Sequence, residues 1–140
     1  GLEPWDNNLN TKYLKEKYKN KKLPIKTVLL DQKIIVGIGN IYADEILFLG
    51  RINPLKQAFK LNEKELQSII DNTKNVLEKA IKLGGTTIRS YESSEGVHGR
   101  FQNELLVHNK EICPKCNKKI TKIRIGGRGT YYCENCQKDI

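Results

Sequence analysis

No apolar run in this 140-residue sequence reaches the length of about 18 residues that a membrane-spanning helix needs. The first residues also lack the charged start and apolar stretch that are typical of a signal peptide. Cysteine is absent before Cys113, which argues against disulfides that staple the whole fold. These absences predict a cytoplasmic protein, and the length predicts one ordinary domain or a helical domain with a small satellite.

Acidic residues are fewer than basic residues in this sequence. Sixteen Asp and Glu residues stand against 25 Lys and Arg residues, which gives a formal net charge of +9. A polyanion is the partner that such an excess most often serves, although a basic ribosomal-type or merely soluble protein is the alternative. One basic cluster lies between residues 110 and 138, and an earlier one consists of Lys12, Lys15, Lys17, Lys19, Lys21, Lys22 and Lys26.

Helix signals dominate the first half of the chain. Asn10 is a candidate cap for a first helix, and Pro24 opens a second helix that runs through residues 28–30. The segment Gly37-Ile38-Gly39-Asn40 predicts a tight double turn, and the apolar pattern after it predicts a helix that ends at Gly50.

The clearest helix begins at Asn62, which can form a capping box with Glu65, and it stops at Gly84-Gly85. Residues 86–100 have no period and predict an exposed, mobile loop. Leu105-Leu106-Val107 predicts a short strand, and residues 120–125 and 130–132 predict two more. The tail is too small to bury a core without help.

Two Cys-x-x-Cys motifs carry the strongest chemical signal. Cys113 and Cys116 form the first pair, Cys133 and Cys136 form the second, and 16 residues separate the pairs. This spacing is typical of a structural zinc site, and four thiolates leave zinc no open position for a substrate. A redox dithiol is the alternative, but the βαβ context that supports such a motif is missing.

Two glycine-containing segments are candidate phosphate contacts. At Gly39 and Asn40, free backbone N–H groups and the positive end of the helix dipole suit a phosphate. Asn40 could act as both cap and donor. The alternative is that two glycines before a helix simply make a turn. Gly126-Gly127-Arg128-Gly129 would place Arg128 at a hairpin tip that reaches DNA; a solvated arginine in an ordinary turn is the alternative.

Other polar residues are weaker candidates. Asp44 and Glu45 could be read as paired catalytic carboxylates, but adjacent helix positions point in different directions, so a solvated or capping role is expected. His98 and His108 are isolated from any nucleophile, and neither is assigned a function. We therefore predict no catalytic residue in this chain.

The decapeptide Val36-Gly37-Ile38-Gly39-Asn40-Ile41-Tyr42-Ala43-Asp44-Glu45 resembles the helix-two-turns-helix signature of formamidopyrimidine-DNA glycosylases and of the related endonuclease VIII group. Ile25-Lys26 and Leu29-Leu30-Asp31 precede it as in that family. Further matches follow in the same order, so the resemblance covers essentially the whole chain; they are Gly84-Gly85-Thr86-Thr87-Ile88-Arg89, Phe101-Gln102 and Gly127-Arg128-Gly129-Thr130-Tyr131-Tyr132-Cys133.

The Gly-Gly-Thr-Thr segment and the zinc hairpin favour the formamidopyrimidine branch, whose enzymes excise 8-oxoguanine and ring-opened purines and nick the abasic strand by β,δ-elimination. The resemblance implies phosphate contacts from the turn with Gly39 and Asn40, from Lys26 and from Arg128. It implies one structural Zn²⁺ on Cys113, Cys116, Cys133 and Cys136. It also implies that the loop of residues 89–99 closes over the extruded base.

The sequence departs from the family at its start. The family's enzymes attack the sugar with the amine of an N-terminal proline, assisted by a glutamate, in a separate front domain. Residue 1 here is Gly, and the nitrogen of Pro4 is locked in a peptide bond, so we expect no glycosylase or lyase activity from this chain alone. An active truncated lyase is the alternative, and borohydride trapping on an abasic duplex would detect it.

These inferences predict a mainly α fold: a linker remnant (residues 1–9), a helix-two-turns-helix DNA-binding domain (10–108) and a four-cysteine zinc finger with a β-hairpin (109–140). The expected function is that of the DNA-binding C-terminal part of a bifunctional glycosylase and abasic-site lyase for oxidised purines. We expect a bacterial, nucleoid-associated monomer that binds damaged or abasic duplex DNA and no membrane. The alternative is a zinc-ribbon module that binds RNA or protein without a role in repair.

Overall fold

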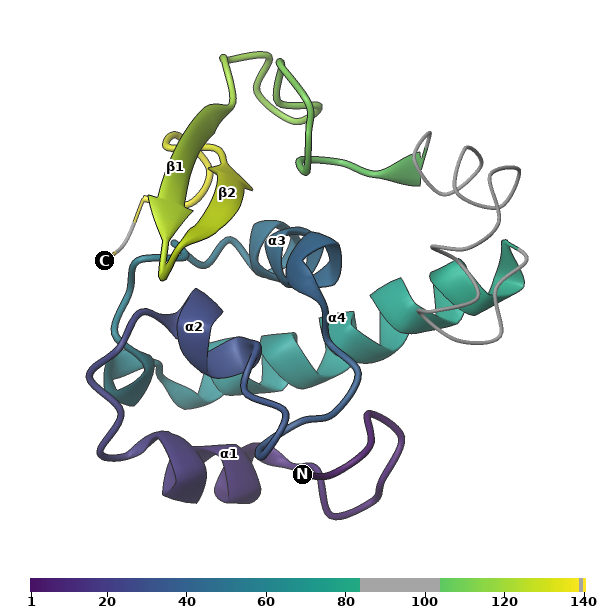
Figure 1. Cartoon of the computed structure of the whole chain (residues 1–140), viewed down its shortest axis with the longest axis vertical. Coiled ribbons are helices and arrows are strands. Elements are labelled where there is room, and N and C mark those ends of the chain that lie inside the picture. Colours follow the sequence, from purple (N-terminus) through teal and green to yellow (C-terminus); the bar gives the residue numbers. More distant parts are fainter. Residues whose placement is uncertain (84–103, 139) are drawn as a thin grey trace.

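The computed structural model describes residues 1–83, 104–138 and 140. Its helices are α1 (Thr11–Tyr18), α2 (Ile25–Leu29), α3 (Asn40–Leu49), the short 3₁₀ helix η1 (Ala58–Lys60) and α4 (Glu63–Lys82). Strands β1 (Thr121–Ile125) and β2 (Arg128–Tyr132) form an antiparallel hairpin. Figure 1 shows α4 extending below α2 and α3, with α1 and the hairpin on opposite sides of the molecule. The prediction of a mainly α fold with a zinc-finger hairpin is confirmed.

The helix boundaries follow the predicted caps closely. The side chain of Asn10 accepts a hydrogen bond of 2.8 Å from the Tyr13 N–H at the start of α1. Pro24 is the N-cap of α2, and Gly50 is the C-cap of α3. None of the helices in the described part of the chain combines the length and the apolar character needed to cross a bilayer.

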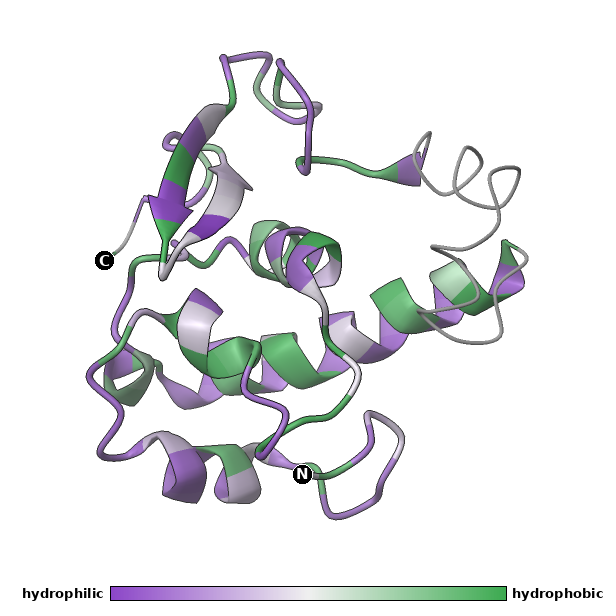
Figure 2. Cartoon of the chain, in the orientation of Figure 1, coloured by the Kyte–Doolittle hydropathy of each residue, from purple (hydrophilic) through white to green (hydrophobic). Residues whose placement is uncertain are grey.

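Helix α4 begins with the predicted capping box. The Asn62 side chain accepts from the Glu65 N–H at 2.8 Å, and the Glu65 carboxylate accepts from the Asn62 N–H at 3.0 Å. Apolar and polar segments alternate along α4 in Figure 2, as expected for a helix with one buried face. Its buried apolar residues join the main core with α1, α2 and α3; they are Leu66, Ile69, Ile70, Val76, Leu77 and Ala80.

The tail has a small core of its own, completed by a residue from α3. Phe48 is fully buried and packs with Val107, Cys113, Ile120 and Cys133. This arrangement agrees with the expectation that the tail cannot bury a core unaided. The tail therefore packs on α3 through apolar contact.

The predicted strand at Leu105-Leu106-Val107 is wrong. Leu106 and Val107 form bends, Leu105 has no regular structure, and the N–H groups of Leu106 and Val107 donate to the Glu45 carboxylate at 2.7 and 2.9 Å. A carboxylate with two oxygens replaces the partner strand, so the apolar run needs no sheet to satisfy its backbone.

Several predicted features lie outside the described residues. They are the glycine stop of α4 at Gly84-Gly85, the Gly-Gly-Thr-Thr segment, the loop of residues 89–99, His98 and Phe101-Gln102. The last described residue before this segment is Leu83, which is the C-cap of α4.

Candidate zinc centre and nucleic-acid interface

The four cysteines converge on one point. Their sulfur atoms all lie within 4.8 Å of one another, with Sγ–Sγ distances of 3.8 Å for Cys113–Cys136 and 3.5 Å for Cys116–Cys133. A tetrahedral zinc with bonds of about 2.3 Å to sulfur requires sulfur atoms about 3.8 Å apart. The donor set and its spacing therefore fit one structural Zn²⁺, as the paired motifs predicted.

Local backbone bonds shape both cysteine turns. The Asn117 N–H donates to the Cys113 carbonyl at 2.9 Å, and the Gln137 N–H donates to the Cys133 carbonyl at 2.9 Å.

The cysteine thiols differ in acidity. The backbone N–H of Lys118 lowers the pKa of the Cys116 thiol to about 6, whereas burial raises the pKa of Cys133 and raises that of Cys136 to about 12.

Gln137 fastens the second cysteine turn to the helical part, which the sequence did not reveal. Its fully buried side chain donates to the Ile52 carbonyl at 2.9 Å and accepts from the Cys133 N–H at 2.9 Å. Its backbone carbonyl accepts from the Asn53 side chain at 2.8 Å. The second turn is thus joined to the segment that follows α3.

The glycine turn before α3 is held by a side chain. Gln32 Nε2 donates to the carbonyl oxygens of Leu30 and Ile38 at 3.0 and 3.1 Å, and Gln32 Oε1 accepts from the Gly37 N–H at 2.8 Å. Gly37 has a φ of +92°, a conformation that favours glycine. Sequence reasoning did not single out Gln32, which lies five residues before Gly37.

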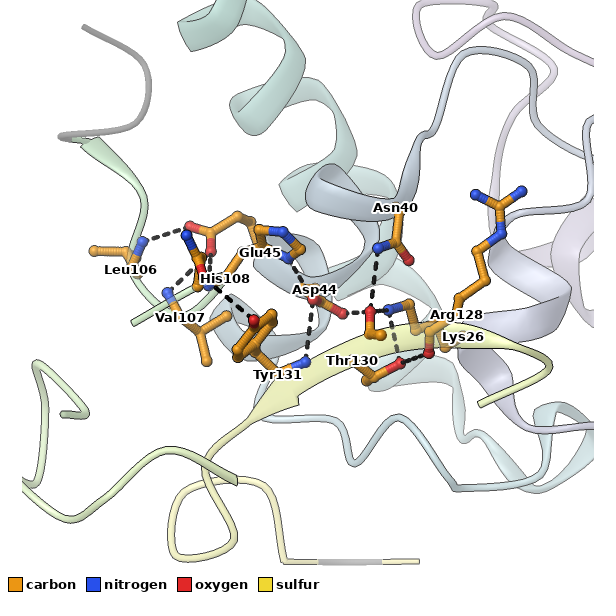
Figure 3. A network of polar contacts seen from close by, with 12 residues as sticks. Lys26, Asn40, Asp44, Glu45, Leu106, Val107, His108, Arg128, Thr130 and Tyr131 are labelled. Carbon is orange, nitrogen blue, oxygen red and sulfur yellow. Dashed lines mark hydrogen bonds and ion pairs between the residues drawn. The ribbon is translucent and has the colours of Figure 1, made fainter. Parts of the chain in front are cut away.

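Asn40 does not cap α3. Gly39 is the N-cap, Asn40 is the first helical residue, and no side chain caps the first turn within the described residues. The Asn40 side chain does act as a donor, but its partner lies inside the chain: Nδ2 donates to the Gly129 carbonyl at 3.1 Å. The helix entrance and the zinc hairpin, which are 89 residues apart in sequence, are therefore in direct contact (Figure 3).

Arg128 begins β2, opposite Ile125 and beside the two-glycine turn. Positive φ angles of +55° at Gly126 and +78° at Gly127 suit a tight hairpin turn. Arg128 is exposed, and its side chain extends out of the polar network in Figure 3. Among the described residues it has no ion pair, so its guanidinium is available to an external anion.

Lys26 has a different environment from the one the resemblance implied. Its side chain is 1% exposed, and Nζ lies 2.7 Å from Asp44 Oδ1. Nζ also donates to the Gly129 carbonyl at 3.0 Å and to Thr130 Oγ1 at 2.8 Å. Burial lowers the pKa of Lys26, and the Asp44 carboxylate opposes this effect. A phosphate would reach this ammonium only if the hairpin moved.

Asp44 and Glu45 are neither solvated nor capping, which corrects the expectation for this pair. Both are buried, at 1% and 4% exposure. Asp44 faces Lys26 and the hairpin, whereas Glu45 faces residues 106–108, so the predicted divergence of their side chains is confirmed. His108, which had no assigned function, lies with Nδ1 2.7 Å from Asp44 Oδ2.

The early lysine cluster does not gather at this interface. Apart from buried Lys26, its members are exposed on α1 or just after it, and Figure 1 shows α1 on the far side of α2 and α4 from the hairpin. Their charge therefore contributes to the general field around the protein and not to the contacts around Asn40 and Arg128.

The fold and this site define a helix-two-turns-helix protein that carries a four-cysteine zinc finger packed on α3. Residues 1–92 match the formamidopyrimidine-DNA glycosylase H2TH domain, and residues 110–138 match the zinc finger found in FPG and IleRS. The chain belongs to the formamidopyrimidine-DNA glycosylase family.

Curated bacterial relatives agree with this assignment. The chain is 46% identical over 139 residues to the formamidopyrimidine-DNA glycosylase of Oceanobacillus iheyensis, covering 98% of this chain and 50% of that protein. It is 48% identical over 116 residues to the enzyme of Listeria monocytogenes serotype 4b, covering 81% and 42%. The chain thus spans about half the length of the relatives it matches.

Solved structures give the same result. The Lactococcus lactis Fpg in complex with abasic-site DNA has a TM-score of 0.86 and 42% identity, covering 99% of this chain and 52% of that chain. A complex of the same enzyme with DNA that contains N7-benzyl-Fapy-dG has a TM-score of 0.86 and 41% identity, with coverages of 99% and 51%.

Proposed function

We propose that this chain is the DNA-binding C-terminal part of a bifunctional DNA glycosylase and abasic-site lyase that removes oxidised purines. The observation that carries the proposal is the direct contact between Asn40 at the entrance of α3 and Gly129 beside Arg128. Two phosphate-binding elements are thereby joined into one surface. Solved relatives in complex with DNA that contains an abasic site or N7-benzyl-Fapy-dG support DNA as the ligand.

The grip on DNA would use three groups with different chemistry. Gly39 lets a phosphate approach the backbone, because the one described atom within 4 Å of a Cβ added there is Tyr42 Cδ2, at 3.9 Å. The first turn of α3 offers the positive end of the helix dipole, and the Asn40 amide lies beside it. Arg128 supplies a guanidinium that can bind a phosphate in a bidentate manner. Lys26 would act by holding the hairpin that carries Arg128.

Cys113, Cys116, Cys133 and Cys136 would be the ligands of one structural Zn²⁺. Bound zinc would supply a rigid cross-link between the two cysteine turns and no reaction step. In the described tail the two strands pair at five positions, and the apolar cluster of five buried residues borrows Phe48 from α3, so metal binding and folding of the tail should be coupled.

The remaining assignments follow from this function. Residues 10–108 would form the helix-two-turns-helix domain, residues 109–140 the zinc finger, and residues 1–9 a linker to a catalytic domain. We place the protein in the bacterial cytoplasm as a monomer associated with nucleoid DNA. The excision of 8-oxoguanine and formamidopyrimidines would belong to the whole protein, because the reacting amine is expected in the front domain.

Binding measurements on the zinc-loaded chain test this function. We expect a duplex with an abasic site to bind more tightly than a single-stranded RNA of equal length. Asn40→Ala and Arg128→Ala should each weaken duplex binding by about tenfold, as expected for loss of one charge-assisted or amide contact to phosphate. Lys64→Ala removes an exposed charge elsewhere and is the matched control. Equal binding of RNA, or unchanged duplex affinity in both variants, would favour a zinc-ribbon interaction module instead.

A further inference from the structure

We propose that Asp44 is a positioning residue for the DNA grip: it docks the zinc hairpin on α3 and so sets where Arg128 stands relative to Asn40. The inference rests on the proposed DNA-binding function and adds a residue that has no role in it so far. Glu45, the next residue, assists by holding the chain segment that leads into the zinc unit.

Asp44 joins three separate segments through one carboxylate. Oδ1 lies 2.7 Å from Lys26 Nζ on α2. Oδ2 lies 2.7 Å from His108 Nδ1 and accepts a bond of 3.1 Å from the Tyr131 N–H on β2. The carboxylate is completely buried, and Figure 3 shows these partners converging on it from different elements. No other described carboxylate bridges the helices and the hairpin in this way.

Glu45 binds the backbone of the segment that leads into the zinc unit. Its carboxylate accepts from the consecutive N–H groups of Leu106, Val107 and His108 at 2.7, 2.9 and 2.9 Å. Neighbouring residues on a helix project about 100° apart, so one turn of α3 can hold the hairpin on one side and the entry segment on the other. The side chain of His108 then returns to Asp44, which links the two attachments.

The chain of contacts continues from Asp44 to the proposed phosphate grip. Lys26, paired with Asp44, donates to the Gly129 carbonyl and to Thr130 Oγ1. The Gly129 carbonyl also accepts from Asn40 Nδ2. Gly129 follows Arg128 directly, so the position of Arg128 depends on contacts that pass through a buried carboxylate and a buried ammonium.

Burial makes this arrangement sensitive to the loss of one charge. A buried ion pair adds little net stability compared with apolar residues, but removing one partner leaves the other charge uncompensated. Loss of the Asp44 charge should therefore drive Lys26 toward solvent and displace the hairpin above it. Removal of both charges should remove the free-energy cost of an unpaired buried charge without restoring the contacts that hold the hairpin on α3.

The test uses Asp44→Asn in the zinc-loaded full chain, with Asp71→Asn as a control that makes the same charge change on the exposed face of α4. We expect Asp44→Asn to keep one zinc per chain and to weaken binding of an abasic duplex by about tenfold. In this background Arg128→Ala should cost less than about threefold, whereas Asn40→Ala should keep its effect. A general loss of structure would reduce both effects alike.

The double variant Lys26→Met/Asp44→Asn separates positioning from stability. We expect its melting temperature to recover toward that of the unmodified chain while the contribution of Arg128 stays small. If Arg128→Ala costs as much in the Asp44→Asn chain as in the unmodified chain, the positioning role is wrong although DNA binding stands. Loss of zinc from both Asp44 variants would also overturn it. Absence of duplex binding by the unmodified chain would instead reject the proposed function.

Discussion

The Asn40 side chain donates a hydrogen bond of 3.1 Å to the carbonyl oxygen of Gly129. Asn40 opens α3, and Gly129 lies in β2 next to Arg128. The bond fixes the hairpin at the helix entrance, where backbone N–H groups and a guanidinium can face the same polyanion.

Gly39→Ala should weaken duplex binding by about tenfold and change the free energy of unfolding by less than about 0.5 kcal/mol. Gly39 has a φ of −96°, which any residue adopts, and a Cβ would have room in the free protein. The methyl group would obstruct only a partner that approaches the backbone. Fluorescence anisotropy with an abasic duplex and thermal melting measure the two effects.

Gly37→Ala provides the contrast within the same turn. Gly37 has a φ of +92°, so an alanine there should cost about 1–3 kcal/mol of stability although no atom of the described residues lies within 4 Å of the added Cβ. Unchanged duplex affinity in Gly39→Ala would show that phosphate does not approach this turn, whatever Gly37→Ala does to stability.

Gln137→Ala should destabilise the zinc unit by about 2–3 kcal/mol, because the Cys133 N–H and the Ile52 carbonyl would both lose buried partners. We expect zinc to be released to a chelator faster than from the unmodified chain, which a colorimetric zinc indicator would follow. The exposed neighbour Lys138, replaced by Ala, is the control. Equal release rates in the two variants would contradict a fastening role for Gln137.

Zinc affinity should fall as the pH falls. Burial raises the pKa of Cys133 and raises that of Cys136 to about 12, so zinc must displace at least these two protons near neutral pH. The apparent dissociation constant should therefore rise by at least about 100-fold per pH unit between pH 8 and pH 7.

A steeper dependence is expected at lower pH. The Lys118 N–H lowers the pKa of Cys116 to about 6, so this thiol is already ionised above that pH and takes up a further proton below it. Chelator competition at several pH values measures the slope. A pH-independent affinity would contradict binding through four thiolates.

The parts of the structure that local chemistry determines could be predicted from the sequence. Asn10 and Asn62 are caps that satisfy N–H groups three residues away, and the two Cys-x-x-Cys pairs carry their ligand geometry within four residues. Such features depend on near neighbours in sequence. They could therefore be predicted from the sequence without knowledge of the fold, and so could the two-glycine turn of the hairpin.

Contacts between distant segments could not be predicted. The pairing of Lys26 with Asp44 and Thr130, and of Glu45 with residues 106–108, joins positions that have no common sequence period. The sequence predicted a solvated or capping role for Asp44 and Glu45. Charged residues are rarely buried without partners, and the partners of this pair lie up to 87 residues away in sequence. The strand predicted at residues 105–107 failed for the same reason.

The most direct test of the account is the salt dependence of duplex binding by the zinc-loaded chain. Each phosphate neutralised contributes about 0.9 to the slope of log affinity against log salt concentration. We predict that Arg128→Ala lowers the magnitude of this slope by about one relative to the unmodified chain, while the exposed-lysine control Lys15→Ala leaves it nearly unchanged. An identical slope for the unmodified chain and Arg128→Ala would contradict a phosphate grip built on the zinc hairpin.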